Sequence, residues 1–245
     1  MKLVSFFFFS IVLLTSNLTL AQKLSNKEGN AFSLTANVGA SSFANSLAWT
    51  HVYGIGKNKR FKVGYGLRLT NFFGSDQNFT TAPAKYTSGK SSLAALFSEN
   101  IIANIDTIAL GKVQTNFINA GIYLNYTLPY WKNRLELGVN IDAVGFTFGS
   151  KQNASYNNNT VSAKPTSFNL LLISDSDVGS LNSEWYISYW ATKNLKIKAG
   201  YEFLFTEYTT DTKIQPIPGT TERNDRFRLK SPMVMFGIVY APFKK

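Results

Sequence analysis

Apolar and polar residues alternate with a period of two in eight segments of this chain. The alternation is cleanest between residues 60 and 73, where Phe61, Val63, Tyr65, Leu67 and Leu69 are separated by charged, polar or glycine residues. A period of two places successive side chains on opposite faces of a β-strand. The pattern therefore predicts eight strands, over residues 31–40, 45–55, 60–73, 113–128, 134–148, 183–191, 195–208 and 226–243.

The linkers between these segments alternate between short and long. The short linkers are 56–59, 131–133 and 192–194, and the long ones are 74–112, 150–182 and 209–225. Strands joined by tight turns at one end and long loops at the other are typical of bacterial transmembrane β-barrels. The predicted fold is all-β: an antiparallel up-and-down transmembrane β-barrel of about eight strands over residues 31–243, with long structured extracellular loops.

The first 21 residues have the pattern of an export signal. Lys2 precedes an apolar stretch over residues 3–14, and Thr19 and Ala21 provide small residues before a cleavage site. The apolar stretch is too short to span a bilayer, so we expect a secretory signal peptide over 1–21 and a periplasmic extension over 22–30. The absence of cysteine excludes a lipidated N-terminal cysteine and structural disulfides. Signal and strand pattern together predict an outer-membrane location.

Composition agrees with a membrane surface. Aromatic residues make up 15% of the chain, with 20 Phe and 12 Tyr, as expected for aromatic girdles at both membrane interfaces. The net charge of +11 decreases by one on removal of the signal, because Lys2 is its only charged residue. Export argues against nucleic acid as a partner, and we expect Lys and Arg at turns and rims, near the anionic head groups of outer-membrane lipids.

A soluble, lipocalin-like periplasmic binding barrel would show the same alternation with its faces exchanged. Its apolar side chains would fill the interior and its polar ones would face water. The aromatic density near strand ends and the asymmetry of the loop lengths favour the membrane barrel.

The last strand carries a resemblance to a known superfamily. Residues 233–243 alternate as Met-Val-Met-Phe-Gly-Ile-Val-Tyr-Ala-Pro-Phe. With this strand, and with the alternation from residue 31 onward, the chain resembles the small, eight-stranded outer-membrane β-barrels of Gram-negative bacteria. The resemblance implies that Tyr240 and Phe243 form an assembly signal for the barrel-assembly machinery, although Pro242, Lys244 and Lys245 depart from the usual pattern. The superfamily includes adhesion, structural, channel and enzymatic members, so function does not follow from the fold.

If the apolar face meets lipid, the opposite face places charged residues in the lumen. The expected lumen residues are Lys62, Arg68, Glu136, Asp142, Glu184, Lys196, Lys198, Glu202, Arg226, Arg228 and Lys230. The interior of an eight-stranded barrel is just wide enough to be filled by side chains. Mixed charges in that space are expected to pair into a structural core, because an unpaired buried charge is destabilising. The alternative is a narrow, cation-lined pore that favours anions.

The sequence offers little for catalysis or metal binding. The only histidine, His51, is in phase with lipid-facing residues, and Glu136 and Asp142 lie about 20 Å apart along one strand. Residues 175–179 begin like a calcium loop, but Gly179 comes one position early and Tyr186 stands where the final Glu should be. No catalytic residue, cofactor or metal site is therefore predicted.

Two long loops contain apolar runs that should not remain in water. The runs are 93–97, 101–105 and 168–173. We expect them to pack on each other as a lid above the membrane, with a short helix near 92–100 and an extra strand. The alternatives are a binding surface for a hydrophobic ligand or a protein partner, and two extra strands, which would make ten and spoil the loop asymmetry. The polar stretch 149–160 is predicted to be a mobile tip.

The function that fits best is a non-enzymatic outer-membrane barrel with a structural or interaction role through its external loops. The alternative is a narrow channel for small or hydrophobic solutes. A lipid-modifying enzyme fits less well.

Overall fold

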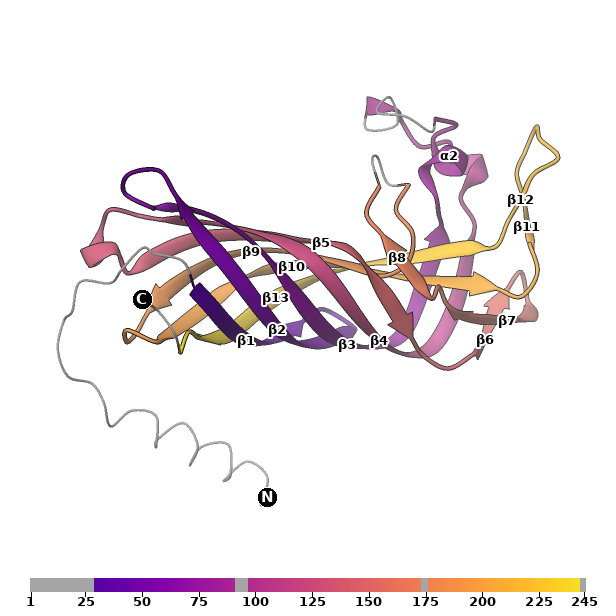
Figure 1. Ribbon diagram of the computed structural model, residues 1–245. Helices are drawn as coiled ribbons and strands as arrows, with labels where there is room; N and C mark the ends of the chain where they lie inside the picture. Colours follow the sequence, from indigo (N-terminus) through magenta and orange to yellow (C-terminus); the bar gives the residue numbers. More distant parts are fainter. Residues whose placement is uncertain (1–28, 91–96, 173–175, 243–245) are drawn as a thin grey trace, which may run out of the picture.

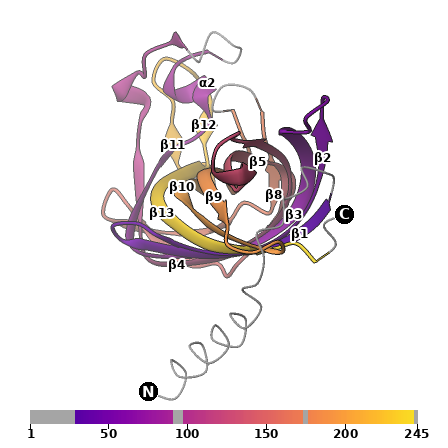
Figure 2. The ribbon, with the colours of Figure 1, turned by 90° about the vertical axis from the view of Figure 1, so that its left-hand side faces the viewer.

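Eight antiparallel strands close into a ring in the computed structural model, which describes residues 29–90, 97–172 and 176–242. Each strand pairs with its neighbour along the ring, and the last pairs with the first, as Figures 1 and 2 show. The prediction of an all-β, eight-stranded antiparallel barrel is confirmed. The ring strands are β1 (Gly29–Val38), β2 (Ser42–Ile55), β3 (Phe61–Thr81), β4 (Thr107–Thr127), β5 (Leu135–Phe148), β9 (Leu181–Trp190), β10 (Leu195–Thr210) and β13 (Arg226–Tyr240).

The two ends of the barrel differ in their connections. The short links β2–β3, β4–β5 and β9–β10 meet at one end, on the left in Figure 1, and the second of them contains the 3-10 turn η3 (Trp131–Asn133). We call this the tight-turn end and the opposite one the loop end. The predicted signal peptide and Phe243 lie outside the described residues.

The loop end contains a second closed ring of strands, which the sequence pattern did not predict. Strands β3 and β4 are 21 residues long, against 14 for β2 and β5, and continue past the end of the main ring. Strands β6 (Gln152–Tyr156) and β7 (Asn159–Pro165) form a hairpin that pairs with β4 and with the end of β10. The pairing of β13 with the end of β3 closes this outer ring. The prediction of a mobile tip over 149–160 is therefore wrong, because most of that stretch is paired strand.

The apolar run at 168–172 does not form a lid with the run at 101–105. Strand β8 (Phe168–Leu170) instead pairs with β5, beside the part of β5 that β9 is too short to reach. The ring of Phe168 packs edge-on against Phe146 with centroids 5.7 Å apart, and both rings are exposed on the outer wall. The run therefore extends the apolar wall of the barrel. Residues 92–96 of the predicted helix near 92–100 lie outside the described residues.

The connection from β3 to β4 spans residues 82–106, and its described parts, 82–90 and 97–106, form an arm. It contains the single turn of helix α2 (Ala84–Thr87) and the 3-10 turn η2 (Ile102–Asn104). Strands β11 (Gln215–Pro216) and β12 (Arg223–Asn224) form a separate hairpin between β10 and β13. Both project from the loop end in Figure 1.

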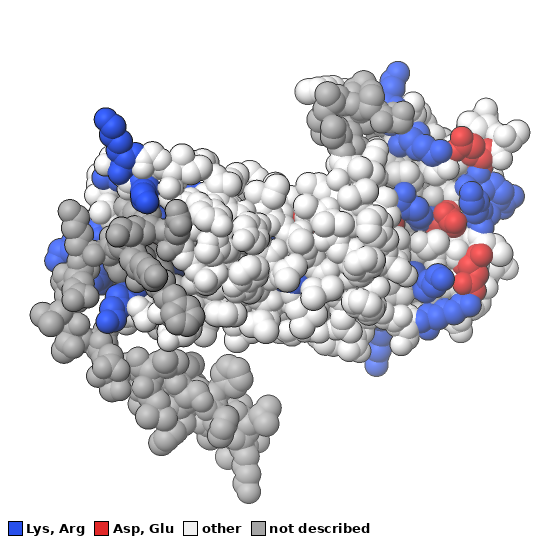
Figure 3. Space-filling view, in the orientation of Figure 1, with Lys and Arg blue, Asp and Glu red and all other residues white. Residues whose placement is uncertain are grey.

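The outer wall of the main ring is apolar over most of its length. Large apolar side chains are exposed on all eight strands, and Trp185 and Phe236 are each 62% exposed. Figure 3 shows Lys and Arg at the two ends, with a band between them that is almost free of charge. Such a band is what a transmembrane barrel presents to lipid. Among the described residues, no helix is long and apolar enough to cross a membrane.

Candidate functional site

Eight of the predicted lumen residues are on inward-facing positions of the main ring. Seven of them are at most 4% exposed, and the side chain of Lys196 is 13% exposed. They come from β3, β5, β9 and β10, where alternate residues are buried. Together they form two charged layers between the tight-turn end and the middle of the barrel. They are Lys62, Arg68, Glu136, Asp142, Glu184, Lys196, Lys198 and Glu202.

The first charged layer is centred on Glu136. Lys62 Nζ lies 2.5 Å from Glu136 Oε1, and Lys196 Nζ lies 2.7 Å from Oε2. The hydroxyl of Thr127 donates a third hydrogen bond to Oε1 at 3.2 Å. Lys196 also lies over the ring of Trp190, 4.8 Å from its centroid. Two ammonium groups thus share one carboxylate, and the layer has one excess positive charge.

The second charged layer is centred on Arg68. Its Nη1 lies 2.8 Å from Glu184 Oε1, and its Nη2 lies 3.4 Å from Asp142 Oδ1. Lys198 Nζ donates to Glu184 Oε2 at 2.6 Å. Asn140 accepts from Arg68 at 2.5 Å and donates to Glu184 at 2.7 Å. These ion pairs and hydrogen bonds connect β3, β5, β9 and β10 across the lumen.

Amide side chains extend this layer toward β8. Asn119 donates to Asp142 at 2.8 Å, and Asn169 donates to Asn119 at 2.7 Å. Thr147 donates to Asn169 at 2.7 Å. The inward phase of Asn119 and Asn140 was visible in the sequence, but their role as connectors needed the cross-strand register. Asn169 lies in a segment that the sequence pattern predicts to be a loop.

Glu202 is the exception in the second layer. It is fully buried and lies directly opposite Glu184 in the β9–β10 register. Neither of its carboxylate oxygens has a hydrogen-bond partner among the described residues. Two carboxyls side by side on one face of a sheet repel when both are ionised. Glu202 is therefore buried without the pairing that the other lumen charges have.

The expectation that Arg226, Arg228 and Lys230 face the lumen is corrected by the structure. On this part of β13 the inward positions are Phe227 and Leu229, which belong to an apolar core. The three cations alternate with them and are on the outer face. The sequence pattern predicts the opposite phase here, because it places apolar residues on the outward face along the whole strand.

Arg226 and Arg228 instead form a latch on the outside of the sheet. Arg226 donates to both carboxylate oxygens of Glu207, at 2.8 and 2.9 Å, and Arg228 donates to Oε2 at 3.1 Å. Both guanidinium groups also donate to the carbonyl of Asp177, which follows β8. The Gly179 amide completes the latch with a 3.2 Å bond to Glu207. In the described part of the calcium-like sequence, residues 176–179, the Asp177 carbonyl thus accepts hydrogen bonds from two arginines. Lys230 remains exposed beside this latch.

An apolar core fills the interior at the loop end. It begins directly beyond the charged layers and continues into the outer ring, and its largest members are fully buried. Phe79 packs edge-on against Tyr208 with centroids 5.1 Å apart. The core consists of Ala44, Phe72, Phe79, Ile108, Leu110, Val113, Phe117, Ala154, Ala163, Leu204, Tyr208, Phe227, Leu229 and Met233.

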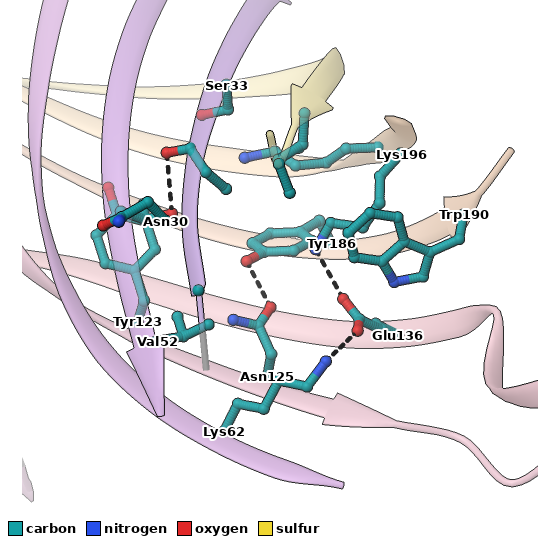
Figure 4. Close-up of a pocket in the computed structure, with 16 residues that line it drawn as sticks. Asn30, Ser33, Val52, Lys62, Tyr123, Asn125, Glu136, Tyr186, Trp190 and Lys196 are labelled. Atoms are coloured by element: carbon teal, nitrogen blue, oxygen red, sulfur yellow. Dashed lines mark hydrogen bonds and ion pairs between the residues drawn. The ribbon is translucent and has the colours of Figure 1, made fainter. Parts of the chain in front are cut away.

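One small cavity lies at the tight-turn end of the lumen. It has a volume of about 60 Å³, which suffices for a few water molecules. In Figure 4, Lys62 and Lys196 point toward Glu136 from opposite sides, and Tyr186 donates to Asn125 at 2.8 Å. The charged layer of Arg68 and the apolar core lie between this cavity and the loop end. The cavity therefore does not continue through the barrel to the loop end.

The remaining residues that could support catalysis or metal binding do not lie close together. His51 lies on the outer wall, where Nδ1 is 2.7 Å from Asn30 Oδ1 and the ring packs between Tyr53 and Tyr65. Among the described residues, no three His, Cys, Asp or Glu side chains are arranged to hold a metal ion. The side chains that are brought together are those of the two charged layers.

Comparisons with known proteins give structural similarity without sequence similarity. No family model matches the chain, and no curated protein matches it. Neisserial surface protein A is 9% identical, with 87% of this chain and 94% of that one covered and a TM-score of 0.35. The N-terminal barrel of Pseudomonas aeruginosa OprF is 8% identical, with 90% and 99% covered and a TM-score of 0.37. Yersinia pestis Ail is 10% identical, with 88% and 99% covered and a TM-score of 0.37. The fold assignment rests on the strand pairing described above.

Proposed function

We propose that this protein is a closed outer-membrane β-barrel that acts without catalysis, through a rigid platform at its loop end. The tight-turn end then faces the periplasm, as the predicted signal peptide over residues 1–21 would require. Exposed Lys57, Lys132 and Lys193 on the tight turns would meet anionic lipid head groups there. Phe243, outside the described residues, and Tyr240 would serve the barrel-assembly machinery, as the resemblance implies.

The single observation that carries the proposal is the filling of the interior. Salt-bridged layers occupy the periplasmic half, and an apolar core occupies the other half. A hydrated pore needs a continuous polar path, and Phe72, Phe117 and Leu204 interrupt any such path. This filling supports a structural or interaction role over the channel alternative.

The platform supports an interaction role more specifically. Loops carry function when a scaffold holds them, and here the outer ring is that scaffold. Its six paired strands, which include the β6–β7 hairpin, carry the arm and the β11–β12 hairpin.

Conductance of the purified protein in planar bilayers tests the closed state. We expect no discrete current steps, while the same sample shows a heat-dependent gel shift that reports folded barrel. Reproducible steps from heat-modifiable protein would overturn the proposal in favour of the channel.

Complementation separates a structural from an interaction role. A strain without the protein is compared with strains carrying the full chain, or a variant in which 212–222 are replaced by Gly-Ser. If both restore resistance to detergent, the barrel itself stabilises the envelope. If only the full chain does, the platform acts through a partner.

A further inference from the structure

We propose that the cavity at the tight-turn end of the lumen binds one small monovalent anion, such as chloride, between Lys62 and Lys196. The site needs only the folded barrel, so this inference goes beyond the proposed function and does not depend on it. The charge around the cavity, its hydrogen-bond donors and its size each favour that ligand.

The charge around the cavity is the first observation. Among the described residues that line it, Glu136 is the only acidic one. Lys62 and Lys196 both pair with this carboxylate, and Lys62 and Glu136 are at most 4% exposed. Lys198 also lines the cavity, but it is paired with Glu184 of the second charged layer. The two lysines that share Glu136 therefore leave one buried positive charge without a counter-charge.

Among the described residues, no other carboxylate offsets this charge locally. Glu184 and Asp142 are already paired with Arg68. Glu202 lies six positions along β10 from Lys196, which is roughly 20 Å on an extended strand. A buried charge without a counter-charge is destabilising. One monovalent anion in the cavity would neutralise it.

The hydrogen-bond donors are the second observation. An ammonium group has three N–H donors and no acceptor. Lys62 and Lys196 each donate one hydrogen bond to Glu136. Asn125 accepts from the Tyr186 hydroxyl through Oδ1, so its NH₂ group is a further donor at the cavity. Both oxygens of Glu136 already accept hydrogen bonds, and in Figure 4 Lys62 and Lys196 lie on opposite sides of it. A lining rich in donors suits an anion and not a cation.

The size of the cavity restricts the ligand further. Its volume of about 60 Å³ holds a few water molecules. A halide ion is only slightly larger than a water molecule and fits, whereas a sugar acid does not. The side chain of Lys196 is 13% exposed, so solvent reaches the site from the tight-turn end.

Unfolding by urea in detergent micelles tests the proposal. The protein is compared in sodium chloride and in sodium gluconate at equal sodium concentration, because gluconate is too large for the cavity. Lys196→Gln removes the excess charge, while Glu136 keeps its ion pair with Lys62. Lys193→Gln, exposed on the turn between β9 and β10, removes the same charge away from the cavity and is the matched control.

We expect chloride to raise the ratio of folded to unfolded protein by about tenfold over gluconate, the gain from one ligand at about ten times its Kd. The gain should persist in Lys193→Gln and disappear in Lys196→Gln. No gain in the wild type overturns the proposal. An equal gain in Lys196→Gln also overturns it, because the effect would then be a general one of salt.

Crystals soaked in bromide locate the ion. We expect an anomalous difference peak in contact with Nζ of both Lys62 and Lys196. A map without a peak at this position overturns the proposal, even if chloride stabilises the protein.

Discussion

The two halves of the barrel interior exclude water by opposite means. Along β3 the inward side chains change from Lys62 and Arg68 in the half at the tight-turn end to Phe72 and Phe79 in the half at the loop end. The outward side chains change in the opposite sense on β4, from Ile118 and Ile122 to Lys112 and Gln114.

This inversion shows that the environment outside the wall decides what the interior can contain. Where lipid surrounds the strands, apolar side chains face outward and polar ones pair inside. Where the strands enter water, the outer ring has the arrangement of a soluble barrel, with an apolar core. The same strands change from a polar interior with an apolar outer face to an apolar interior with a polar outer face within a few residues.

The largest expected effect on stability comes from removing the central cation of the second charged layer. Arg68→Met leaves Glu184 and Asp142 buried without their shared cation, so we expect a loss of about 3–5 kcal/mol in the free energy of unfolding. Urea unfolding in lipid vesicles measures it. Adding Asp142→Asn, which leaves the Glu184–Lys198 ion pair intact, should restore more than half of the loss. A single variant as stable as the wild type would show that the layer is solvated rather than paired.

A cavity in the apolar half should have a smaller and local effect. Phe79→Ala removes a fully buried ring from the outer ring of strands and should destabilise that ring by about 3 kcal/mol. Hydrogen exchange should accelerate in β6 and β7, while the β1–β2 pair remains protected. Equal acceleration in both regions would mean that the two halves unfold as one unit.

The latch outside the sheet is expected to contribute less. Glu207→Gln removes the carboxylate that Arg226 and Arg228 share, and we expect a local loss of about 1–3 kcal/mol. Exchange of the Gly179 and Ser180 amides should accelerate. Lys230→Gln, an exposed neighbour, is the matched control and should change neither amide.

The smallest effect concerns pH at the loop end. Burial and the 2.6 Å hydrogen bond to Asp106 raise the pKa of Tyr156 to about 12. Since the folded pKa exceeds the unfolded pKa of about 10, the stabilisation is full below pH 10 and is lost as the pH rises through 12. Ultraviolet titration of the wild type against Tyr156→Phe should show one tyrosine fewer ionising near pH 12. A difference near pH 10 would contradict this.

Much of the membrane half could be predicted from the sequence because its rule is periodic. The alternation in residues 60–69 and the three tight turns were sufficient for the strand number and order, and eight of the lumen charges were placed on the inward phase. The phase failed on β13, where Arg228 is outward and Phe227 inward. A period of two gives the two faces of a strand but does not say which one meets the solvent, and here the solvent changes along the strand.

The sequence by itself determined the eight strands of the main ring, their antiparallel order and the apolar band, because these depend on local alternation and on turn length. Only the tertiary structure decided the closure of the outer ring, the pairing of β8 with β5 and the direction of the arm. Each of these depends on contacts between segments far apart in the chain, such as Phe227 with Thr81 and Tyr208 with Pro165. Such contacts are selected by the fit of whole surfaces, for which a linear pattern has no signal.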